Sequence, residues 1–414
     1  MFKSNGMKLY PNLVKAVVEA IDKIFTHGEK ADRLIEQTLK LDTKWGSRDR
    51  KFVANAIYDV VRWYRLYKSC LNDEQINSNQ FYHLFAVSHI LKGFELPAWK
   101  EFELIDADKI KETHIKNKHI RKIANSIPDW LDELGLEQFG ALVWEQEISC
   151  LNKEADVYIR VNTLKVEEKF NLLETLKKEG VEVSKVVHPL FDDIAMTTTF
   201  KLEKRQRLQH LASYKNGMFE IQDAASQLVA PFLDVKPGMT VIDACAGAGG
   251  KTLHLASLMQ NKGKILAMDV EQKKLDELEK RALRAGVKIV KTQLINKHEI
   301  SKNKNSADRL LLDVPCSGLG VLRRNPDAKW KLNPTFLLEI QKVQAQILID
   351  YSVMLKPGGL MVYATCSILP SENQNQVKNF IQLVGNKYEL VAEKSILPTQ
   401  GFDGFYMALI KKIN

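Results

Sequence analysis

The sequence predicts an α/β protein whose C-terminal half is a doubly wound parallel sheet, preceded by a small α+β region and an all-helical region. Two observations predict the C-terminal half. From about Leu233 onward, apolar segments of strand length alternate with helical segments, as in a parallel sheet covered by helices. The first of these strands runs into a glycine-rich turn, Asp243-Ala-Cys-Ala-Gly-Ala-Gly-Gly-Lys-Thr252, which opens a helix.

The alternating pattern defines a C-terminal domain with expected boundaries 226–414. The Lys356-Pro-Gly-Gly turn stops the helix that precedes the fifth strand, because proline and glycine do not continue a helix. The predicted strands are 239–244, 264–269, 289–295, 308–314 and 359–365, and the predicted helices are 251–260, 271–285, 335–354 and 371–384.

Two further domains are predicted upstream. Residues 1–145 are expected to form a helical domain, because apolar residues recur there at helical spacing. Residues 146–225 are expected to form the small α+β domain, because strand signals at 156–162 and 180–187 flank a helical pattern at 166–179. The helical spacing in the first domain is clearest at Leu13, Val17, Ala20, Ile21 and Ile24, and again from Phe52 to Tyr64.

The bulk composition narrows the class of protein. A chain of 414 residues suits two or three domains of about 150 residues each. Its net charge of +9, from 60 Lys and Arg against 51 Asp and Glu, favours a polyanionic partner. Five cysteines without framework spacing indicate a reducing compartment. Neither a membrane-spanning run nor a signal-peptide pattern is present, so we expect a cytoplasmic monomer without membrane contact.

The glycine-rich turn indicates a nucleotide-like ligand. Gly247, Gly249 and Gly250 let the backbone approach a ligand closely, and the N-terminus of the following helix offers unpaired N–H groups. The spacing is not that of the phosphate-binding loop GxxxxGK[ST]. Asp269 ends the second strand roughly 20 residues later, where a carboxylate accepts hydrogen bonds from ribose hydroxyls. Asp269 is equally placed to cap the next helix, and one carboxylate can do both.

Cys316 and Cys366 each follow a predicted strand. The carboxyl ends of parallel strands meet at the sheet edge where doubly wound folds bind their ligands. If strands 308–314 and 359–365 are neighbours, the two thiols share one pocket with Asp313 at its mouth. The pattern by itself does not decide which thiol acts as nucleophile. The remaining cysteines outside the glycine turn, Cys70 and Cys150, are predicted to be small buried hydrophobes.

The motifs together resemble the Sun/Fmu (RsmB/NOP2/Sun) family of RNA cytosine-5 methyltransferases, bacterial rRNA type. The resemblance covers about residues 125 to 412. More weakly, the helical region resembles the NusB-like RNA-binding domain of the bacterial rRNA members, best at Asp49-Arg-Lys-Phe-Val-Ala-Asn-Ala-Ile-Tyr-Asp-Val-Val-Arg. The segments that carry the resemblance are the glycine turn, Arg160-Val-Asn-Thr-Leu-Lys, Gln222-Asp-Ala-Ala-Ser, Leu312-Asp-Val-Pro-Cys-Ser-Gly-Leu-Gly with Arg323-Arg-Asn-Pro-Asp-Ala-Lys-Trp330, Lys356-Pro-Gly-Gly, Ala364-Thr-Cys-Ser with Glu372-Asn, and Gly401-Phe-Asp-Gly-Phe-Tyr-Met-Ala.

The resemblance implies a Rossmann-like methyltransferase domain that uses S-adenosylmethionine as methyl donor and needs no metal. It places Asp269 on the ribose, Asp313 near the methionine end and Asn296 near the adenine. The turn departs from the family pattern, because Ala246-Gly-Ala-Gly-Gly lacks a proline, and Asn296 stands where the family has an aspartate. An amide oxygen still accepts a hydrogen bond, so binding is expected to persist. The implied donor-binding residues are Cys245, Ala246, Gly247, Ala248, Gly249, Gly250, Lys251, Asp269, Asn296 and Asp313.

The resemblance also assigns the two thiols. It implies that Cys366 adds to carbon 6 of a cytosine, which makes carbon 5 nucleophilic, and that Cys316 assists release of the product. The implied substrate is RNA, with small-subunit rRNA favoured by the helical domain. The alternatives are a tRNA cytosine-5 methyltransferase and a noncatalytic RNA-binding or ribosome-assembly factor on the same fold.

RNA access requires positive charge near the target base, which must leave its stack to reach a thiol. The basic stretch 108–122 is either a solvated helix face or an RNA-facing one, and the sequence leaves both open. The residues predicted to contact the RNA backbone are Arg160, Arg323, Arg324 and Lys329.

Overall fold

The computed structural model describes residues 8–76, 78–166, 169–191 and 198–414. Its contacts divide the chain into two compact units. The helical unit comprises the chain up to Lys153 together with Leu322–Pro334, and the sheet unit comprises Glu154–Val321 together with Thr335–Asn414. Each unit has its own apolar core.

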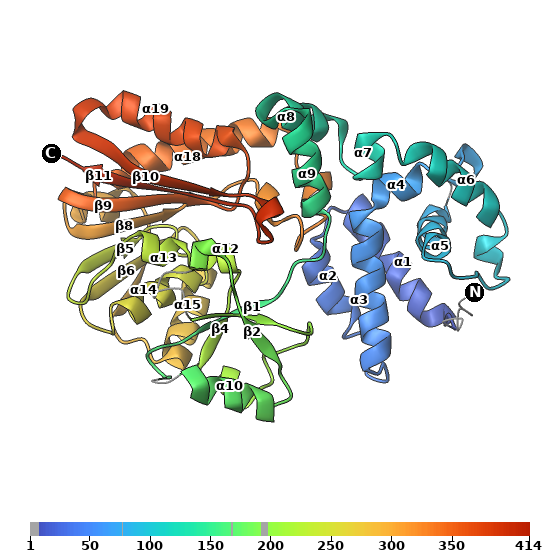
Figure 1. Cartoon of the computed structure of the whole chain (residues 1–414), viewed down its shortest axis with the longest axis horizontal. Helices are drawn as coiled ribbons and strands as arrows, with labels where there is room; N and C mark the ends of the chain where they lie inside the picture. Colours follow the sequence, from blue (N-terminus) through green and yellow to red (C-terminus); the bar gives the residue numbers. More distant parts are fainter. Residues whose placement is uncertain (1–7, 77, 167–168, 192–197) are drawn as a thin grey trace. The chain divides into compact units, whose positions relative to one another are not determined.

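The helical unit forms because apolar residues line one face of each longer helix. The face predicted for α1 is confirmed, since Leu13, Val17, Ala20, Ile21 and Ile24 are all buried. Pro11 occupies the first turn of that helix, where the missing N–H costs nothing. The helices, drawn in Figure 1, are α1 (Pro11–Thr26), α2 (Ala31–Thr38), α3 (Ser47–Arg62), α4 (Tyr64–Lys68), α5 (Gln80–Leu91), α6 (Ala107–Asn117), α7 (Arg121–Ala124), α8 (Asp129–Phe139), α9 (Ala141–Leu151) and α17 (Ala328–Lys331).

The segment Leu322–Pro334 packs in the helical unit, although its sequence position falls inside the predicted C-terminal domain. Trp330 anchors it: the indole Nε1 donates to the carbonyl of Val61 at 2.7 Å, and its ring meets the ring of Tyr64 edge-on. Cys316 precedes this segment by six residues in the chain.

A small antiparallel sheet begins the sheet unit. Within the described residues its strands lie in the order β2-β3-β1-β4. Their inner faces enclose a separate apolar cluster that includes Ile159, Phe200 and Phe219. The elements are β1 (Tyr158–Val161), α10 (Lys169–Lys178), β2 (Val183–Lys185), β3 (Thr199–Leu202), α11 (Ala212–Lys215) and β4 (Phe219–Ile221).

The large sheet has the order β10-β11-β9-β8-β5-β6-β7 within the described residues. The pairs from β9 through β8, β5 and β6 to β7 are parallel, whereas β11 runs antiparallel to both β9 and β10. All five predicted strands are confirmed, as is the adjacency of β8 and β9. The strands are β5 (Thr240–Asp243), β6 (Lys264–Asp269), β7 (Val290–Leu294), β8 (Ala307–Asp313), β9 (Leu355–Thr365), β10 (Tyr388–Ile396) and β11 (Phe405–Lys412).

Helices cover both faces of the large sheet, with α18 and α19 on one face and α13, α14 and α15 on the other (Figure 1). No helix in the described ranges has the length and apolar character of a membrane span. The Rossmann-like α/β fold is confirmed. The helices are α12 (Ala224–Gln227), α13 (Val229–Phe232), α14 (Gly250–Leu258), α15 (Gln272–Ala285), α16 (Lys297–Lys302), α18 (Pro334–Ser352) and α19 (Gln374–Val384).

The strand order positions the site. The connection from β5 leads to β6 on one side, and β8 pairs with the other side of β5. The chain therefore reverses its direction of travel across the sheet at β5. Folds of this kind bind ligands at such a switch point, outside the carboxyl ends of the strands, and we call that edge the crevice. The glycine turn follows β5, and the two cysteine loops follow β8 and β9 at the same edge.

Candidate active site

The glycine turn connects β5 to α14 through a backbone that only glycine adopts comfortably. Gly249, the residue before α14, has a φ of 87°. A Cβ atom there would lie 2.5 Å from Cγ of Leu278, so both the backbone angle and the close packing of α15 require glycine. The turn leads directly into α14, whose first N–H groups have no partner within the helix.

Neighbouring groups hold this turn in place. The N–H of Ala246 donates to the carbonyl of Met268 at 2.9 Å, and Nη1 of Arg281 donates to the carbonyl of Ala248 at 2.7 Å. The Arg281 guanidinium also pairs with Glu220 of β4, which links the small sheet to the turn. The turn is therefore fixed from the strand on one side and from α15 on the other.

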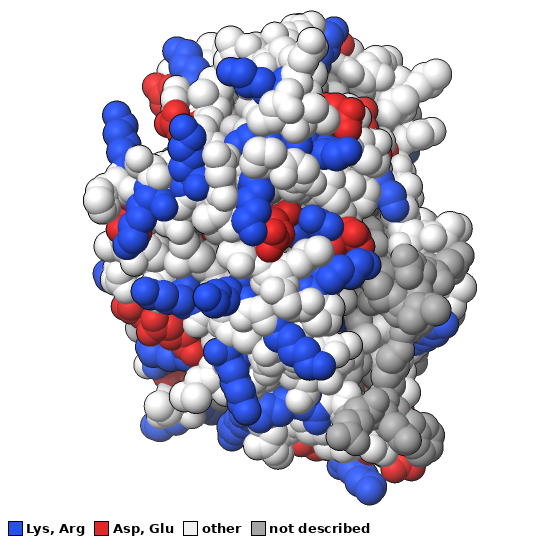
Figure 2. All heavy atoms as spheres, turned by 90° about the vertical axis from the view of Figure 1, so that its left-hand side faces the viewer, with Lys and Arg blue, Asp and Glu red and all other residues white. Residues whose placement is uncertain are grey.

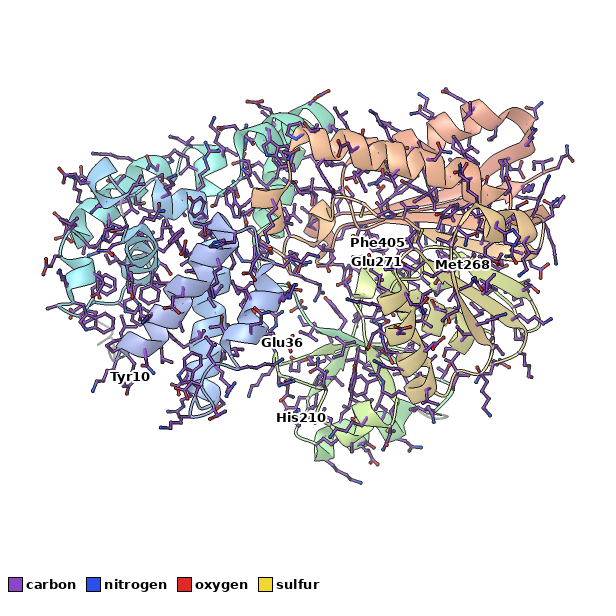
Figure 3. The ribbon with its side chains drawn as sticks, turned by 180° about the vertical axis from the view of Figure 1, so that it is seen from behind. Tyr10, Glu36, His210, Met268, Glu271 and Phe405 are labelled. Carbon is purple, nitrogen blue, oxygen red and sulfur yellow. The ribbon has the colours of Figure 1, made fainter. Side chains whose placement is uncertain are left out.

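Asp269 at the end of β6 makes two hydrogen bonds. One carboxylate oxygen accepts from the N–H of Gly247 at 2.9 Å, and the other accepts from the N–H of Glu271 at 2.9 Å, just before α15. Figure 3 labels Met268 and Glu271, which flank this stretch. The predicted helix cap is not formed, because Glu271 is the N-cap of α15 and Asp269 accepts only from the N–H of that residue, while its other oxygen reaches the glycine turn. Each oxygen keeps a further lone pair for a ligand.

Lys251 and Asp313 form an ion pair across the crevice edge. Nζ of Lys251, in the first turn of α14, lies 2.5 Å from Oδ2 of Asp313, the last residue of β8. Burial by itself lowers the pKa of an ammonium group, but the charges of Asp313 and Cys366 outweigh it and raise the pKa of Lys251. Lys251 also lies over the ring of Phe405, 5.0 Å from its centroid. A fixed positive charge is therefore held beside the thiols.

Asp243 at the end of β5 is buried, and Cys245, two residues later in the turn, is partly buried. Oγ1 of Thr252 donates to the carboxylate of Asp243 at 2.7 Å. Burial raises the pKa of Asp243 to about 7, because the ionised carboxylate loses its hydration. Burial likewise raises the pKa of the Cys245 thiol well above its usual range, so Cys245 stays protonated and is not a nucleophile.

The sulfur atoms of Cys316 and Cys366 lie 3.2 Å apart. Cys366 follows β9 directly and Cys316 lies three residues beyond β8, so adjacent parallel strands bring the two loops together. The N–H of Gly320 donates to the carbonyl of Cys366 at 3.0 Å, which ties the loops a second time. The hydrogen bond with Cys366, burial and the charge of Glu372 raise the pKa of Cys316 well above its usual range.

Glu372 lies between the two cysteine loops and was not predicted as a site residue. It is fully buried in the short turn Pro370–Glu372 before α19, and its carboxylate accepts hydrogen bonds from Ser317 and Ser367, the residues that follow the two cysteines. The sequence signal was the serine after each cysteine together with the Glu-Asn pair. That signal becomes informative only when the loops are known to meet.

Asn296 caps α16 at the carboxyl end of β7. Its side-chain oxygen accepts from the N–H of Glu299 at 3.0 Å. An adenine amino group would have to share this oxygen or approach the amide from another side. The predicted adenine contact therefore stays a prediction.

The structure corrects the predicted RNA contact of Arg160. Its side chain, on β1, is 2% exposed, and Nε donates to Oε1 of Gln222 at 2.8 Å. Burial lowers the pKa of Arg160 to about 10. A side chain in the interior of the sheet unit presents no charge to a phosphate, so the residue is a structural one.

The structure corrects the prediction for Lys329 as well. Lys329 is 1% exposed, and its Nζ lies 2.8 Å from the carbonyl of Arg62 and 3.0 Å from Oδ1 of Asn152. Burial lowers its pKa well below the ordinary value. Arg323 is also buried, whereas Arg324 is partly exposed and remains a candidate for phosphate contact. Elsewhere, Lys and Arg side chains outnumber acidic ones on the face shown in Figure 2.

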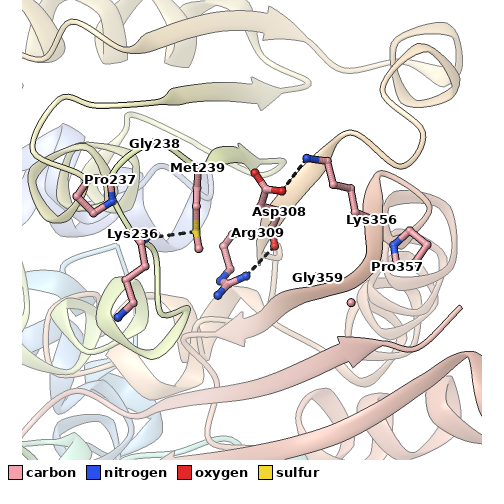
Figure 4. Close-up of a pocket in the computed structure, with 10 residues that line it drawn as sticks. Lys236, Pro237, Gly238, Met239, Asp308, Arg309, Lys356, Pro357 and Gly359 are labelled. Carbon is pink, nitrogen blue, oxygen red and sulfur yellow. Dashed lines mark hydrogen bonds and ion pairs between the residues drawn. The ribbon is translucent and has the colours of Figure 1, made fainter.

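A separate cavity of about 590 Å³ lies at the opposite edge of the large sheet (Figure 4). It is lined by Lys236–Met239 before β5, Asp308 and Arg309 on β8, and Lys356–Gly359 on β9. Nζ of Lys356 donates to Asp308 at 2.6 Å across it. These residues stand at the amino ends of the strands, so this cavity is not the crevice that holds the cysteines.

Comparison with known proteins bears on the crevice. The family model described as 16S rRNA methyltransferase RsmB/F matches residues 230–411, which carry the glycine turn, Asp269, Asp313 and both cysteines. Residues 230–411, hereafter the RsmB/F domain, are therefore similar to that family. The RsmB/F domain therefore coincides with the large sheet, the helices that cover it and the segment Leu322–Pro334.

Curated relatives match a longer stretch. The chain is 30% identical over 298 residues to the "Probable ribosomal RNA small subunit methyltransferase B" of Bacillus subtilis, covering 72% of this chain and 63% of that protein. It is 29% identical over 321 residues to ribosomal RNA small subunit methyltransferase B of Vibrio vulnificus, covering 74% and 70%. The chain thus spans less than two thirds of the length of the Bacillus subtilis protein.

Solved structures share the fold. PH0851 superposes with a TM-score of 0.81 at 24% identity over 99% of this chain and 100% of that one. A methyltransferase homolog from Pyrococcus horikoshii superposes with a TM-score of 0.61 at 26% identity, covering 71% of this chain and 98% of that one. The RsmB/F domain is therefore built on the fold that these proteins share.

Proposed function

We propose that this protein is an S-adenosylmethionine-dependent RNA methyltransferase that methylates carbon 5 of a cytosine in small-subunit rRNA. The observation that carries the proposal is the pair of sulfur atoms 3.2 Å apart beside the glycine turn. A noncatalytic RNA-binding protein has no use for two adjacent thiols at a ligand crevice. The names of the curated relatives support rRNA as the substrate class.

The residues of the crevice fit S-adenosylmethionine. Gly249 leads into α14 with a backbone that strains any other residue, and the first N–H groups of that helix are available to a ligand. Asp269 has lone pairs left for ribose hydroxyls, and Asp313, held by Lys251, lies at the end of β8. When bound there, S-adenosylmethionine supplies an activated methyl group. The proposed donor-binding residues remain Cys245 to Lys251, Asp269, Asn296 and Asp313.

The chemistry of cytosine explains the need for a thiol. Carbon 5 of the ring is a poor nucleophile until a thiolate adds to carbon 6, which places electron density on carbon 5. Cys366 is the proposed attacking thiol. The raised pKa of Cys316 supports this order, because a thiol that keeps its proton is a poor nucleophile and a competent proton donor. Lys251, with its charge maintained by Asp313, lies close enough to Cys366 for the two groups to interact electrostatically.

Release of the product reverses the addition. After methyl transfer, a base removes the proton from carbon 5, and the electron pair re-forms the double bond to carbon 6. The bond from carbon 6 to the Cys366 sulfur breaks, and that sulfur takes a proton from Cys316. The target base must leave its stack to reach the thiols, so an RNA loop or distorted helix is the expected substrate.

The test is incubation of the protein with total RNA and a methyl-labelled donor, followed by mapping of carbon-5-methylated cytosines. Label in one cytosine of small-subunit rRNA is the expected result. Label confined to tRNA would show that the substrate is tRNA rather than rRNA, and it would leave the proposed methylation of carbon 5 unchanged. Donor binding without label in any RNA would favour the noncatalytic RNA-binding factor.

A further inference from the structure

We propose that Glu372 is the positioning residue of the thiol pair: its carboxylate ties the two cysteine loops together, and its charge distinguishes one thiol from the other. This inference rests on the proposed function for its catalytic meaning. The geometric part concerns the protein alone and is measured without RNA or methyl donor.

One carboxylate reaches the residue that follows each cysteine. Its Oε2 accepts from Oγ of Ser317 and from Oγ of Ser367, both at 2.5 Å. Its Oε1 accepts from the N–H of Ser317 at 2.8 Å. Ser317 follows Cys316 and Ser367 follows Cys366, so a single side chain fixes the position of both loops at the point where the thiols stand.

Gln344 of α18 completes the set of donors. Its Nε2 donates to Oε1 of Glu372 and to the carbonyl of Pro315, both at 3.0 Å. Pro315 precedes Cys316, so the first cysteine is held from the residue before it and from the residue after it. The helix that covers the sheet thereby supports the loop rather than leaving it to solvent.

The frame that holds Glu372 is itself anchored to β9. The hydroxyl of Tyr363 donates to the carbonyl of Glu372 at 2.6 Å. The next residue, Asn373, accepts from Oγ1 of Thr365 at 2.5 Å and donates to the carbonyl of Ser367 at 2.9 Å. The carboxylate therefore cannot move away from the Cys366 loop without breaking contacts on both sides of that loop.

Burial of the Glu372 carboxylate costs free energy, so the hydrogen bonds that compensate for this cost identify what the side chain holds in place. Glu372 is 0% exposed, and its four hydrogen-bond donors are neutral hydroxyl, amide and backbone groups. Burying a carboxylate is unfavourable unless hydrogen bonds compensate for the lost hydration. Here every compensating donor belongs to a cysteine loop or to Gln344, so the interactions that stabilise the carboxylate also close the loops.

The charge of Glu372 distinguishes the two thiols. A negative charge nearby disfavours a thiolate, and Glu372 is one of the groups that raise the pKa of Cys316. Cys366 instead interacts with the ammonium group of Lys251. The proton shared by two sulfurs 3.2 Å apart is therefore biased toward Cys316, the proposed donor at product release.

Two substitutions of Glu372 separate the effect of its hydrogen bonds to the cysteine loops from the effect of its negative charge. Glu372→Gln keeps the length of the side chain and one acceptor oxygen, replaces the other oxygen with an NH2 group to which the two serine hydroxyls can act as acceptors, and removes the charge. Glu372→Ala removes both. Ser317→Ala combined with Ser367→Ala keeps the charge and removes the hydroxyl donors, and it serves if the Glu372 variants fail to fold. Asp132→Asn is the matched control, because Asp132 is also buried and accepts from Arg121 and Trp144 in the helical unit.

Distance is measured by cross-linking the two thiols with a short bifunctional thiol reagent. Proton bias is measured by the pH dependence of Cys316 alkylation, resolved by peptide mass spectrometry. We expect Glu372→Gln to preserve the cross-link and to alkylate Cys316 about tenfold faster near pH 8, the effect of lowering its pKa by about one unit. We expect Glu372→Ala and the double serine variant to lose most of the cross-link. Asp132→Asn is expected to behave as wild type in both measurements.

With RNA and donor present, Glu372→Gln is expected to lower kcat, leave the KM for the donor unchanged and accumulate the covalent protein–RNA adduct. If folded Glu372→Gln and Glu372→Ala match wild type in cross-linking and alkylation, the inference is wrong. If wild type methylates no RNA but the thiol measurements change as expected, the proposed function fails while the positioning role stands.

Discussion

The thiols of Cys316 and Cys366 lie within hydrogen-bond distance, 3.2 Å apart, although fifty residues separate them in the chain. Two adjacent parallel strands, β8 and β9, deliver them to the same edge of the sheet. The neighbours of the two thiols differ, because Glu372 acts on Cys316 and Lys251 acts on Cys366. This asymmetry leads to the first prediction.

Cys366→Ala is expected to abolish methylation, because no thiolate then adds to carbon 6. Cys316→Ala is expected to accumulate a covalent protein–RNA adduct, because the leaving sulfur lacks its proton donor. Both are measured with labelled RNA on a denaturing gel, with Cys150→Ala as control, since Cys150 lies in α9 of the helical unit. An adduct trapped by Cys366→Ala would reverse the two roles.

Gly249→Ala is expected to destabilise the protein by about 1–3 kcal/mol and to weaken donor binding. Its φ of 87° strains any other residue, and the added Cβ would meet Leu278. Gly250→Ala is the stability control, because no atom lies within 4 Å of its added Cβ. Urea unfolding and donor titration measure the two effects. Equal stability of the two variants would contradict the strained-turn explanation.

Asp243 is expected to make stability fall as pH rises from about 4 to 7. Its pKa is raised from 3.8 to about 7 in the folded state, so the folded protein holds a proton that the unfolded chain has released. The free energy of unfolding should then decrease by at most about 1.4 kcal/mol per pH unit in that window and level off above it. Comparing wild type with Asp243→Asn by urea unfolding between pH 5 and 8 isolates this contribution. A constant difference across the range would show that Asp243 does not titrate there.

Lys329→Met is expected to destabilise the helical unit by roughly 1–3 kcal/mol, because the carbonyl of Arg62 and Oδ1 of Asn152 lose a buried donor. RNA affinity measured at several salt concentrations should keep its slope, since Lys329 does not reach the surface. Arg324→Ala is the paired variant, for which we expect a shallower salt slope and unchanged unfolding. If Lys329→Met reduced the salt slope of RNA affinity, the original prediction that Lys329 contacts a phosphate would be correct.

Local patterns predicted most of the scaffold correctly. The spacing of Leu13, Val17 and Ile21 identified the buried face of α1, and the apolar runs identified β5 to β9. These features depend on residues close in the chain, because helix and strand periodicity is a local property. The glycine turn was equally readable, since Gly249 meets a backbone requirement that belongs to a single residue.

The predicted surface positions of two charged residues in the same motifs are wrong. Arg160 and Lys329 were predicted at the surface because their charge suggested it, and both are buried with hydrogen-bond partners from distant segments. Lys329 is buried because the segment Leu322–Pro334 packs in the helical unit, and no local sequence pattern predicts that packing. The presence of a charged residue in the sequence does not by itself predict whether its side chain is buried or exposed.

The sequence by itself determined the two thiols, the glycine turn and the positions of strands β5 to β9 along the chain, because each of these features depends on a short segment with its own physical constraint. Only the tertiary structure decided what surrounds the thiols. Glu372 stands 56 residues after Cys316 in the chain, yet its carboxylate holds both cysteine loops. Such a contact arises from the closure of α18 and α19 over the sheet, and side chains meet there because their elements pack, not because their positions in the chain are related.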